Sequence, residues 1–204
     1  MSTAAIAALV ALGFGVMLVR RRSFAIWLVS AQALMLGVAA LSLAGDRAGF
    51  LVAGVILVVR AVALPALLAF ARRRTPEPGL VTPATTVVVR LLVATVVSLV
   101  AVASIPPLGL ADPAAEHGAV ALLSLGIAIV VMRRPALLQV LGILVAENGV
   151  YLLAIAVPGG LPFAIELGVL FDLALVVTVA AAFTQKIHGE VGTGDTDLLR
   201  GLRD

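Results

Sequence analysis

Ionisable residues interrupt three of the long apolar segments of this chain, each close to the centre of its segment. Arg60 lies within GVILVVRAVALP, Glu147 within GILVAENGVYLL and Asp172 within LGVLFDLALV. Glu166 precedes Asp172 by about 9 Å along the axis if the segment is helical. A charge at the centre of a bilayer costs at least about 2.5 kcal/mol. We therefore expect these side chains to face one another, a hydrated space or a partner subunit rather than lipid.

Acidic groups at this depth are suited to proton transfer. Burial favours the neutral carboxyl, whereas a nearby cation favours the anion, so movement of the cation can load or release a proton. A guanidinium keeps its proton, which leaves Glu147, Glu166 and Asp172 as the titrating candidates and Arg60 as the charge that tunes them. Tyr151 lies one turn after Glu147 on the same face and is placed to donate to it. A static Arg60–Glu147 or Arg60–Asp172 pair that only holds helices together is the structural alternative, and the sequence leaves both open.

The composition places these residues in a membrane protein. The chain has 204 residues, of which 62% are hydrophobic and 12% charged, and its mean hydropathy is +1.21, whereas soluble domains carry about a quarter charged residues. With no cysteine and two histidines, we expect no iron–sulfur cluster, metal site or other cofactor, and no catalytic residues. The arginines cluster between apolar runs, which indicates membrane topology rather than nucleic-acid binding.

The apolar runs predict an all-α bundle of about seven transmembrane helices. Basic residues occupy every second connection, after the first, third, fifth and seventh runs, and the positive-inside rule then places the N-terminus outside and the C-terminus in the cytoplasm. Headgroup binding is an alternative role for these clusters. The predicted spans are 3–19, 24–44, 49–71, 84–105, 116–132, 136–157 and 162–186.

Prolines and polar residues divide the chain into four parts. The stretch 75–83, TPEPGLVTP, contains three prolines and separates an N-terminal segment of three spans, 1–74, from a C-terminal segment of four spans, 84–187. The remaining residues, 188–204, form a polar tail. We expect the tail to lie on the cytoplasmic side.

Small and amide residues inside the spans predict how the helices contact one another. Gly142, Ala146 and Gly149 recur at spacings of four and three, a pattern that lets helices approach closely. Gln32 is expected to bond to a neighbouring helix. Arg90 lies near the cytoplasmic end of its span, where a long side chain is expected to extend to the membrane surface.

The C-terminal region resembles a known membrane family. The stretches LVAENGVYLLAI and IELGVLFDLALVV, preceded by RRPALLQVLG at 133–142 and followed by TDLLRGLRD, are similar to the membrane component E of hydrogenase-4, as is VVRAVALP around Arg60. The last three spans of that family resemble subunit K of bacterial respiratory complex I and a small subunit of multisubunit cation/proton antiporters. At the Arg60 position the family pattern typically carries lysine, so arginine retains the charge but not easy deprotonation.

This resemblance implies a non-catalytic subunit of a group 4 hydrogenase or formate hydrogenlyase-like complex in a prokaryotic plasma membrane, coupling electron transfer to proton or ion translocation. Its partners would be antiporter-like and other membrane subunits and the lipid bilayer, with no small-molecule substrate of its own. In subunit K, two glutamates of neighbouring helices belong to the central hydrophilic axis. Glu147 matches the first by its motif, and Glu166 or Asp172 could stand for the second.

Three other roles remain open. The chain could be a purely architectural subunit that docks antiporter-like partners, or a subunit of a cation/proton antiporter complex. A stand-alone small transporter is the third possibility, although the sequence has no matched pair of broken helices, which would point to a midplane substrate site.

Overall fold

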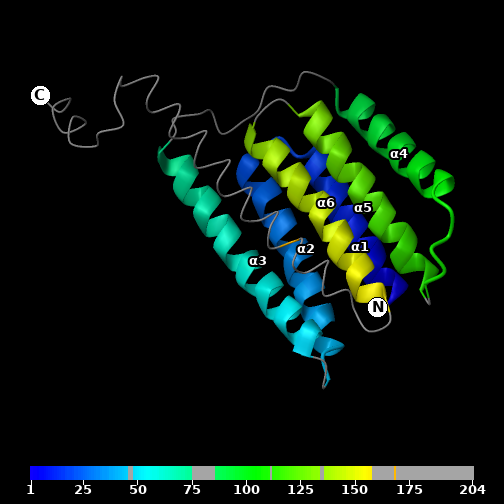
Figure 1. Cartoon of the computed structure of the whole chain (residues 1–204). Coiled ribbons are helices and arrows are strands. Elements are labelled where there is room, and N and C mark those ends of the chain that lie inside the picture. Colours follow the sequence, from blue (N-terminus) through cyan, green and yellow to red (C-terminus); the bar gives the residue numbers. More distant parts are fainter. Residues whose placement is uncertain (46–47, 75–85, 111, 134–135, 158–167, 169–204) are drawn as a thin grey trace, which may run out of the picture. The chain divides into compact units, whose positions relative to one another are not determined.

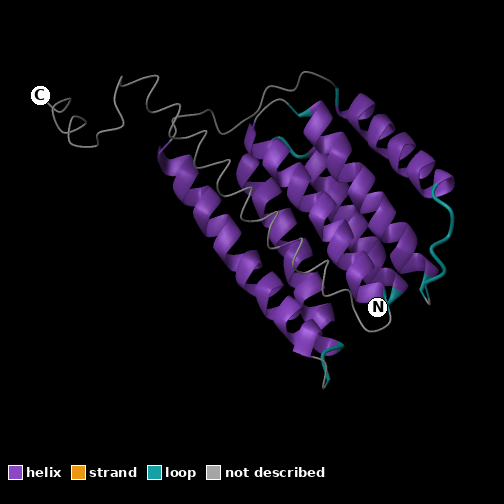
Figure 2. Ribbon diagram, in the orientation of Figure 1, coloured by secondary structure: helices purple, strands orange, loops and turns teal. Residues whose placement is uncertain are grey.

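The computed structural model describes residues 1–45, 48–74, 86–110, 112–133, 136–157 and 168. These described residues form helices and parts of the connections between them, with no strand among them (Figure 2). The expected span at 162–186, the proline-rich stretch 75–83 and the polar tail lie outside the described residues. The described helices all fall within one compact unit, Met1–Ile165, and of the second unit, Glu166–Asp204, Gly168 is described.

The helices coincide with six of the apolar runs, which confirms the all-α class. In chain order, the described helices are α1 Thr3–Leu18, α2 Arg22–Ser42, α3 Ala48–Arg74, α4 Val87–Ser104, α5 Pro113–Met132 and α6 Ala136–Ala156 (Figure 1).

Within the described residues, four helices are long and apolar enough to cross a membrane: α2, α4, α5 and Leu137–Ala156 of α6. Two further apolar helices, Thr3–Leu18 and Gly49–Ala63, are shorter. This is the pattern of a membrane protein, because a span needs about 20 mostly apolar residues. The total number of spans and their orientation stay predictions.

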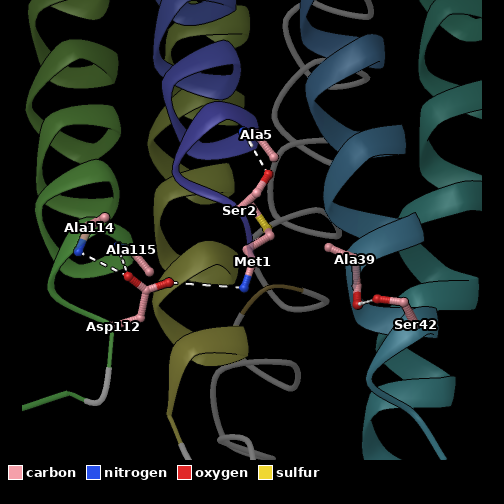
Figure 3. A network of polar contacts seen from close by, with 8 residues as sticks. All are labelled: Met1, Ser2, Ala5, Ala39, Ser42, Asp112, Ala114 and Ala115. Carbon is pink, nitrogen blue, oxygen red and sulfur yellow. Dashed lines mark hydrogen bonds and ion pairs between the residues drawn. The ribbon is translucent and has the colours of Figure 1, made fainter.

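Local side-chain bonds define where several helices begin. The Ser2 hydroxyl accepts from the Ala5 N–H, and Asp112 Oδ1 accepts from the N–H groups of Ala114 and Ala115 at the start of α5 (Figure 3). Asp112 Oδ2 also lies 4.0 Å from the amino group of Met1. Such caps satisfy N–H groups that have no partner inside the helix. The first residues of α1 and the beginning of α5 therefore meet at one end of the described helices.

Glycines allow α5 and α6 to pack backbone against backbone. A Cβ atom on Gly126 would lie 2.5 Å from the Ala146 nitrogen, and one on Gly149 would lie 2.8 Å from the Ala119 oxygen. A Cβ atom on Gly142 would lie 2.9 Å from the Gly126 oxygen. The expectation that the small residues of α6 permit close packing is confirmed, and the contacts show that the two helices run antiparallel.

Helix α4 has one buried stripe and one exposed apolar face. Arg90, Ala94 and Ser98 are buried at spacings of four residues, and the Ser124 hydroxyl of α5 donates to the Ser98 hydroxyl at 3.4 Å. The opposite face exposes large aliphatic side chains such as Val88 and Leu92. This distribution suits a helix with protein on one side and lipid or another subunit on the other.

Candidate functional site

A buried ion pair joins the middle of α3 to the middle of α6. Arg60 Nη2 lies 2.8 Å from Glu147 Oε2, and each side chain is 6% exposed. The two residues are far apart in sequence, and α3 packs mainly along α2, so the long arginine side chain provides the connection to α6. A 2.8 Å separation is typical of a charge-assisted hydrogen bond. The structure thus brings together the cation and the first of the candidate carboxyls.

The ring of Tyr151 completes the immediate surroundings of the pair. The Arg60 guanidinium carbon lies 5.7 Å from the centroid of this ring, and Tyr151 is 2% exposed. A cation within about 6 Å of an aromatic face is attracted by the ring, by about 2 kcal/mol or more when water is excluded. Tyr151 follows Glu147 by one helical turn, so α6 presents a carboxylate and an aromatic face to the same guanidinium. The sequence predicted the shared face but not the contact with arginine.

Amide groups extend this polar environment across two more helices. Asn148 Nδ2 donates to Gln32 Oε1 at 3.3 Å, and Gln32 Nε2 donates to the Leu9 carbonyl of α1 at 2.7 Å. Gln32 and Asn148 are both fully buried. Gly13 leaves room for this arrangement, because a Cβ atom there would lie 3.2 Å from Gln32 Nε2. The expectation that Gln32 bonds to a neighbouring helix is confirmed.

Together these contacts form a polar layer through the described helices. We define the polar layer as Arg60, Glu147, Asn148 and Gln32, with the Leu9 carbonyl at its far end. Each member lies near the middle of its helix, and the residues around it in the sequence are mostly apolar. The helices α1, α2, α3 and α6 therefore all contribute to the layer at about the same depth. Buried polar groups of this kind require partners, and the ion pair supplies them for Arg60 and Glu147 while the amide bonds supply them for Gln32 and for Asn148 Nδ2.

The predicted relay residues are divided between described and undescribed parts of the chain. Of the two pairs anticipated for Arg60, the structure contains the one with Glu147. Glu166 and Asp172 lie outside the described residues, so their place relative to the pair stays a prediction. The geometry meets the requirement shared by a proton relay and a static pair, namely a carboxylate held beside a cation away from water.

Two other arginines lie near the ends of their helices and donate to carbonyls at the end of α1. Arg90 was expected to extend to the membrane surface, but it is 1% exposed and its Nη1 donates to the Met17 carbonyl at 3.2 Å. The side chain is buried in protein because Arg90 lies on the buried stripe of α4, where the C-terminal carbonyls of α1 are accessible. Its level relative to the membrane surface stays a prediction. Arg133, directly after α5, donates through Nη2 to the Val19 carbonyl. Arg90, Ala94 and Ser98 are small or polar residues at spacings of four within an otherwise aliphatic run, and this is the sequence signal that could have indicated a buried stripe containing Arg90.

One further carboxylate is buried at the opposite end of α5. Glu116 is 5% exposed, and its Oε1 accepts from the Leu108 N–H at 2.6 Å. Glu116 lies in the first turn of α5, and its partner is a backbone amide of the connection that precedes this helix. This contact gives Glu116 a local role in holding the connection against the helix. Among the residues the structure describes, no group of three or more acidic, histidine or cysteine side chains is arranged to hold a metal ion.

The chain is similar to an uncharacterized mycobacterial protein. The chain is 30% identical over 164 residues to the uncharacterized protein Rv0085 of Mycobacterium tuberculosis, and the match covers 78% of this chain and 74% of the relative. No protein-family model matches the sequence. No solved structure matches it either.

Proposed function

The chain belongs to the family of the mycobacterial protein Rv0085, and we propose that it is a non-catalytic membrane subunit that contributes a buried carboxyl to proton translocation. Glu147 is the essential carboxyl of this proposal, and Arg60 is the charge that controls its protonation. Glu166 and Asp172 continue the path. The complex is of the group 4 hydrogenase or formate hydrogenlyase type, and its electron carriers belong to other subunits.

The Arg60–Glu147 pair is the observation that supports this proposal most directly. A carboxylate 2.8 Å from a guanidinium, with both side chains 6% exposed, is strongly affected both by burial and by its partner. A small displacement of Arg60 changes the balance between these effects, and a proton then binds or leaves. Tyr151 offers the displaced guanidinium a second favourable contact, since its ring already lies 5.7 Å away.

Buried amide bonds begin at the residue next to Glu147, and their direction suits a lateral path. Asn148 and Gln32 connect the region of Glu147 to α1 through buried hydrogen bonds. The resemblance to subunit K of complex I, in which glutamates form part of a hydrophilic axis, favours the same direction of transfer. Neighbouring antiporter-like subunits are the partners in this arrangement.

A static, architectural pair is the second candidate, and the short distance within the pair favours it equally. The two candidates predict different effects of removing the charge of Glu147 while keeping the shape of its side chain. In the relay proposal, the complex that assembles with Glu147→Gln carries out no coupled proton movement, although loss of the pair lowers the stability of the chain. In the architectural alternative, the complex that assembles with Glu147→Gln moves protons at the wild-type rate, and the double change Arg60→Gln with Glu147→Gln restores full assembly together with proton movement.

The test uses the complete complex purified through a tag on this chain and reconstituted into liposomes that contain a pH-sensitive dye. Electron transfer is driven by reduced methyl viologen, and proton movement and subunit content are measured on the same preparation. Glu116→Gln is the matched control, because it neutralises another buried glutamate, which is bonded to a backbone amide at the end of α5. Proton movement at the wild-type rate in an assembled Glu147→Gln complex would contradict the relay role.

A further inference from the structure

Three arginines from separate parts of the chain gather around the C-terminal end of α1. Arg90 of α4 donates to the Met17 carbonyl at 3.2 Å, and Arg133 after α5 donates to the Val19 carbonyl. Arg20 directly follows these carbonyls in the chain, and its charge repels that of Arg90. We call Arg20, Arg90 and Arg133 the arginine cluster. It lies apart from the polar layer, at the end of the described helices rather than in their middle.

The positive charge of the arginine cluster exceeds what its protein partners neutralise. The carbonyls at the end of a helix carry roughly half a negative charge in total, whereas the cluster carries three guanidinium groups. Within the described residues, no carboxylate forms an ion pair with any of the three. Burial and the neighbouring charge of Arg90 lower the pKa of Arg133 to about 10, a value at which the side chain is still charged at neutral pH.

Several donors of the cluster are also unused. Nε and Nη2 of Arg90 and Nε of Arg133 are buried and have no hydrogen-bond acceptor in the part of the chain that the structure describes. Arg90 and Arg133 are 1% and 3% exposed, so these donors are withdrawn from water. A buried donor without an acceptor is costly, and more so when it is charged. Both side chains would therefore gain from an acceptor that is negatively charged and offers several oxygens.

The position of the cluster indicates where this acceptor comes from. Arg20 is exposed, its charge acts on buried Arg90, and it directly follows Val19, whose carbonyl accepts from Arg133. The cluster lies at the end of helices long and apolar enough to cross a membrane, which is the level of lipid headgroups. A phosphate group matches the requirement, because guanidinium groups bind its oxygens through pairs of parallel hydrogen bonds. One carboxylate has too few oxygens and too little charge for three arginines.

We propose that Arg20, Arg90 and Arg133 form a binding site for a phosphate group, with an anionic phospholipid headgroup or free phosphate as its source. The group enters beside Arg20 and accepts hydrogen bonds from the unused nitrogens of Arg90 and Arg133. It thereby neutralises the junction between α1, α4 and α5. This site does not depend on the proton-relay role of Glu147.

The test measures the thermal stability of the full chain in neutral detergent with added phosphatidylglycerol, phosphatidylcholine or inorganic phosphate. Phosphatidylglycerol is expected to raise the melting temperature saturably, and phosphatidylcholine is expected to leave it unchanged. Loss of one charged contact weakens apparent binding about tenfold or more, so Arg133→Gln and Arg20→Gln should both require correspondingly more lipid. An equal effect of inorganic phosphate, reduced in the same variants, identifies free phosphate as a source.

Arg21→Gln is the matched control. Arg21 is exposed, comes directly after Arg20 in the same connection and makes no side-chain bond to the start of α2. The variant therefore removes the same charge without removing a member of the cluster. Phosphatidylglycerol should raise its melting temperature as much as that of the wild type, and at the same lipid concentration. If Arg133→Gln does not fold, Arg20→Gln is compared with Arg21→Gln alone, because the Arg20 side chain is at the surface and its replacement should not prevent folding. Absence of stabilisation by both ligands, or equal responses of Arg20→Gln and Arg21→Gln, overturns the proposal.

Discussion

Removing either partner of the Arg60–Glu147 pair should destabilise the chain, but with a different dependence on pH. The pair is short, at 2.8 Å, and both side chains are 6% exposed, which is the condition under which loss of one partner costs about 3–5 kcal/mol. Glu147→Gln leaves a buried guanidinium that cannot lose its proton. Arg60→Met leaves a carboxyl, which can escape the cost of a buried charge by binding a proton.

The free energy of protonation limits the penalty for unpairing the carboxyl in Arg60→Met. For an ordinary glutamate, the free energy needed to bind a proton is about 4 kcal/mol at pH 7 and about 1 kcal/mol at pH 5. It rises by about 1.4 kcal/mol for each pH unit above the ordinary pKa of the side chain. The folded variant holds a proton that the unfolded chain has lost, so its stability falls as pH rises through this range. The free energy of unfolding that Arg60→Met loses relative to the wild type should therefore be about 3 kcal/mol smaller at pH 5 than at pH 7. The free energy of unfolding that Glu147→Gln loses should change little between these pH values.

The assay is equilibrium unfolding of the full chain in mixed micelles of neutral detergent and dodecyl sulfate at both pH values. Each variant is compared with the wild type at the same pH, and Arg21→Met serves as the control for loss of an exposed arginine. The double variant Arg60→Met with Glu147→Gln should recover most of the loss, because no charge then remains unpaired. A loss in Arg60→Met that is the same at pH 5 and pH 7 would refute the reasoning, as would a double variant with purely additive effects.

Two further predictions concern packing and the amide bonds. Gly126→Ala should lower the free energy of unfolding by about 1–3 kcal/mol, because its Cβ would meet the Ala146 nitrogen at 2.5 Å, whereas Gly49→Ala meets nothing within 4 Å and should be neutral or stabilising. Equal melting temperatures for these two variants would contradict the close α5–α6 packing. Gln32→Leu should cost about 1–3 kcal/mol, since it leaves buried Asn148 without its amide partner. Unfolding in detergent measures this loss, and a variant as stable as the wild type would show that the bond contributes nothing.

The positions of the described helices agree closely with hydropathy. The predicted runs 136–157 and 3–19 correspond to helices α6 Ala136–Ala156 and α1 Thr3–Leu18. The agreement is close because the backbone of an apolar segment in lipid must form its hydrogen bonds within the segment, as a helix does. The start of α5 differs from the prediction of 116. The helix begins at Pro113 because Asp112 caps it, and a cap of this kind extends a helix into residues that hydropathy counts as part of the connection.

Hydropathy also revealed which charged residues lie deep in apolar segments, but not which of them meet. The depth of Arg60 and Glu147 can be counted along their segments, whereas their contact depends on the rotation of α3 and α6 about their axes. That rotation is set by side-chain packing between helices, including the glycines that bring α5 against α6. The same packing turned Arg90 towards the end of α1 and connected Gln32 to Asn148. Composition and periodicity thus determined the class of protein and the depth of its charges, while tertiary contacts decided their partners, because partners lie on different helices and no local pattern encodes the angle between them.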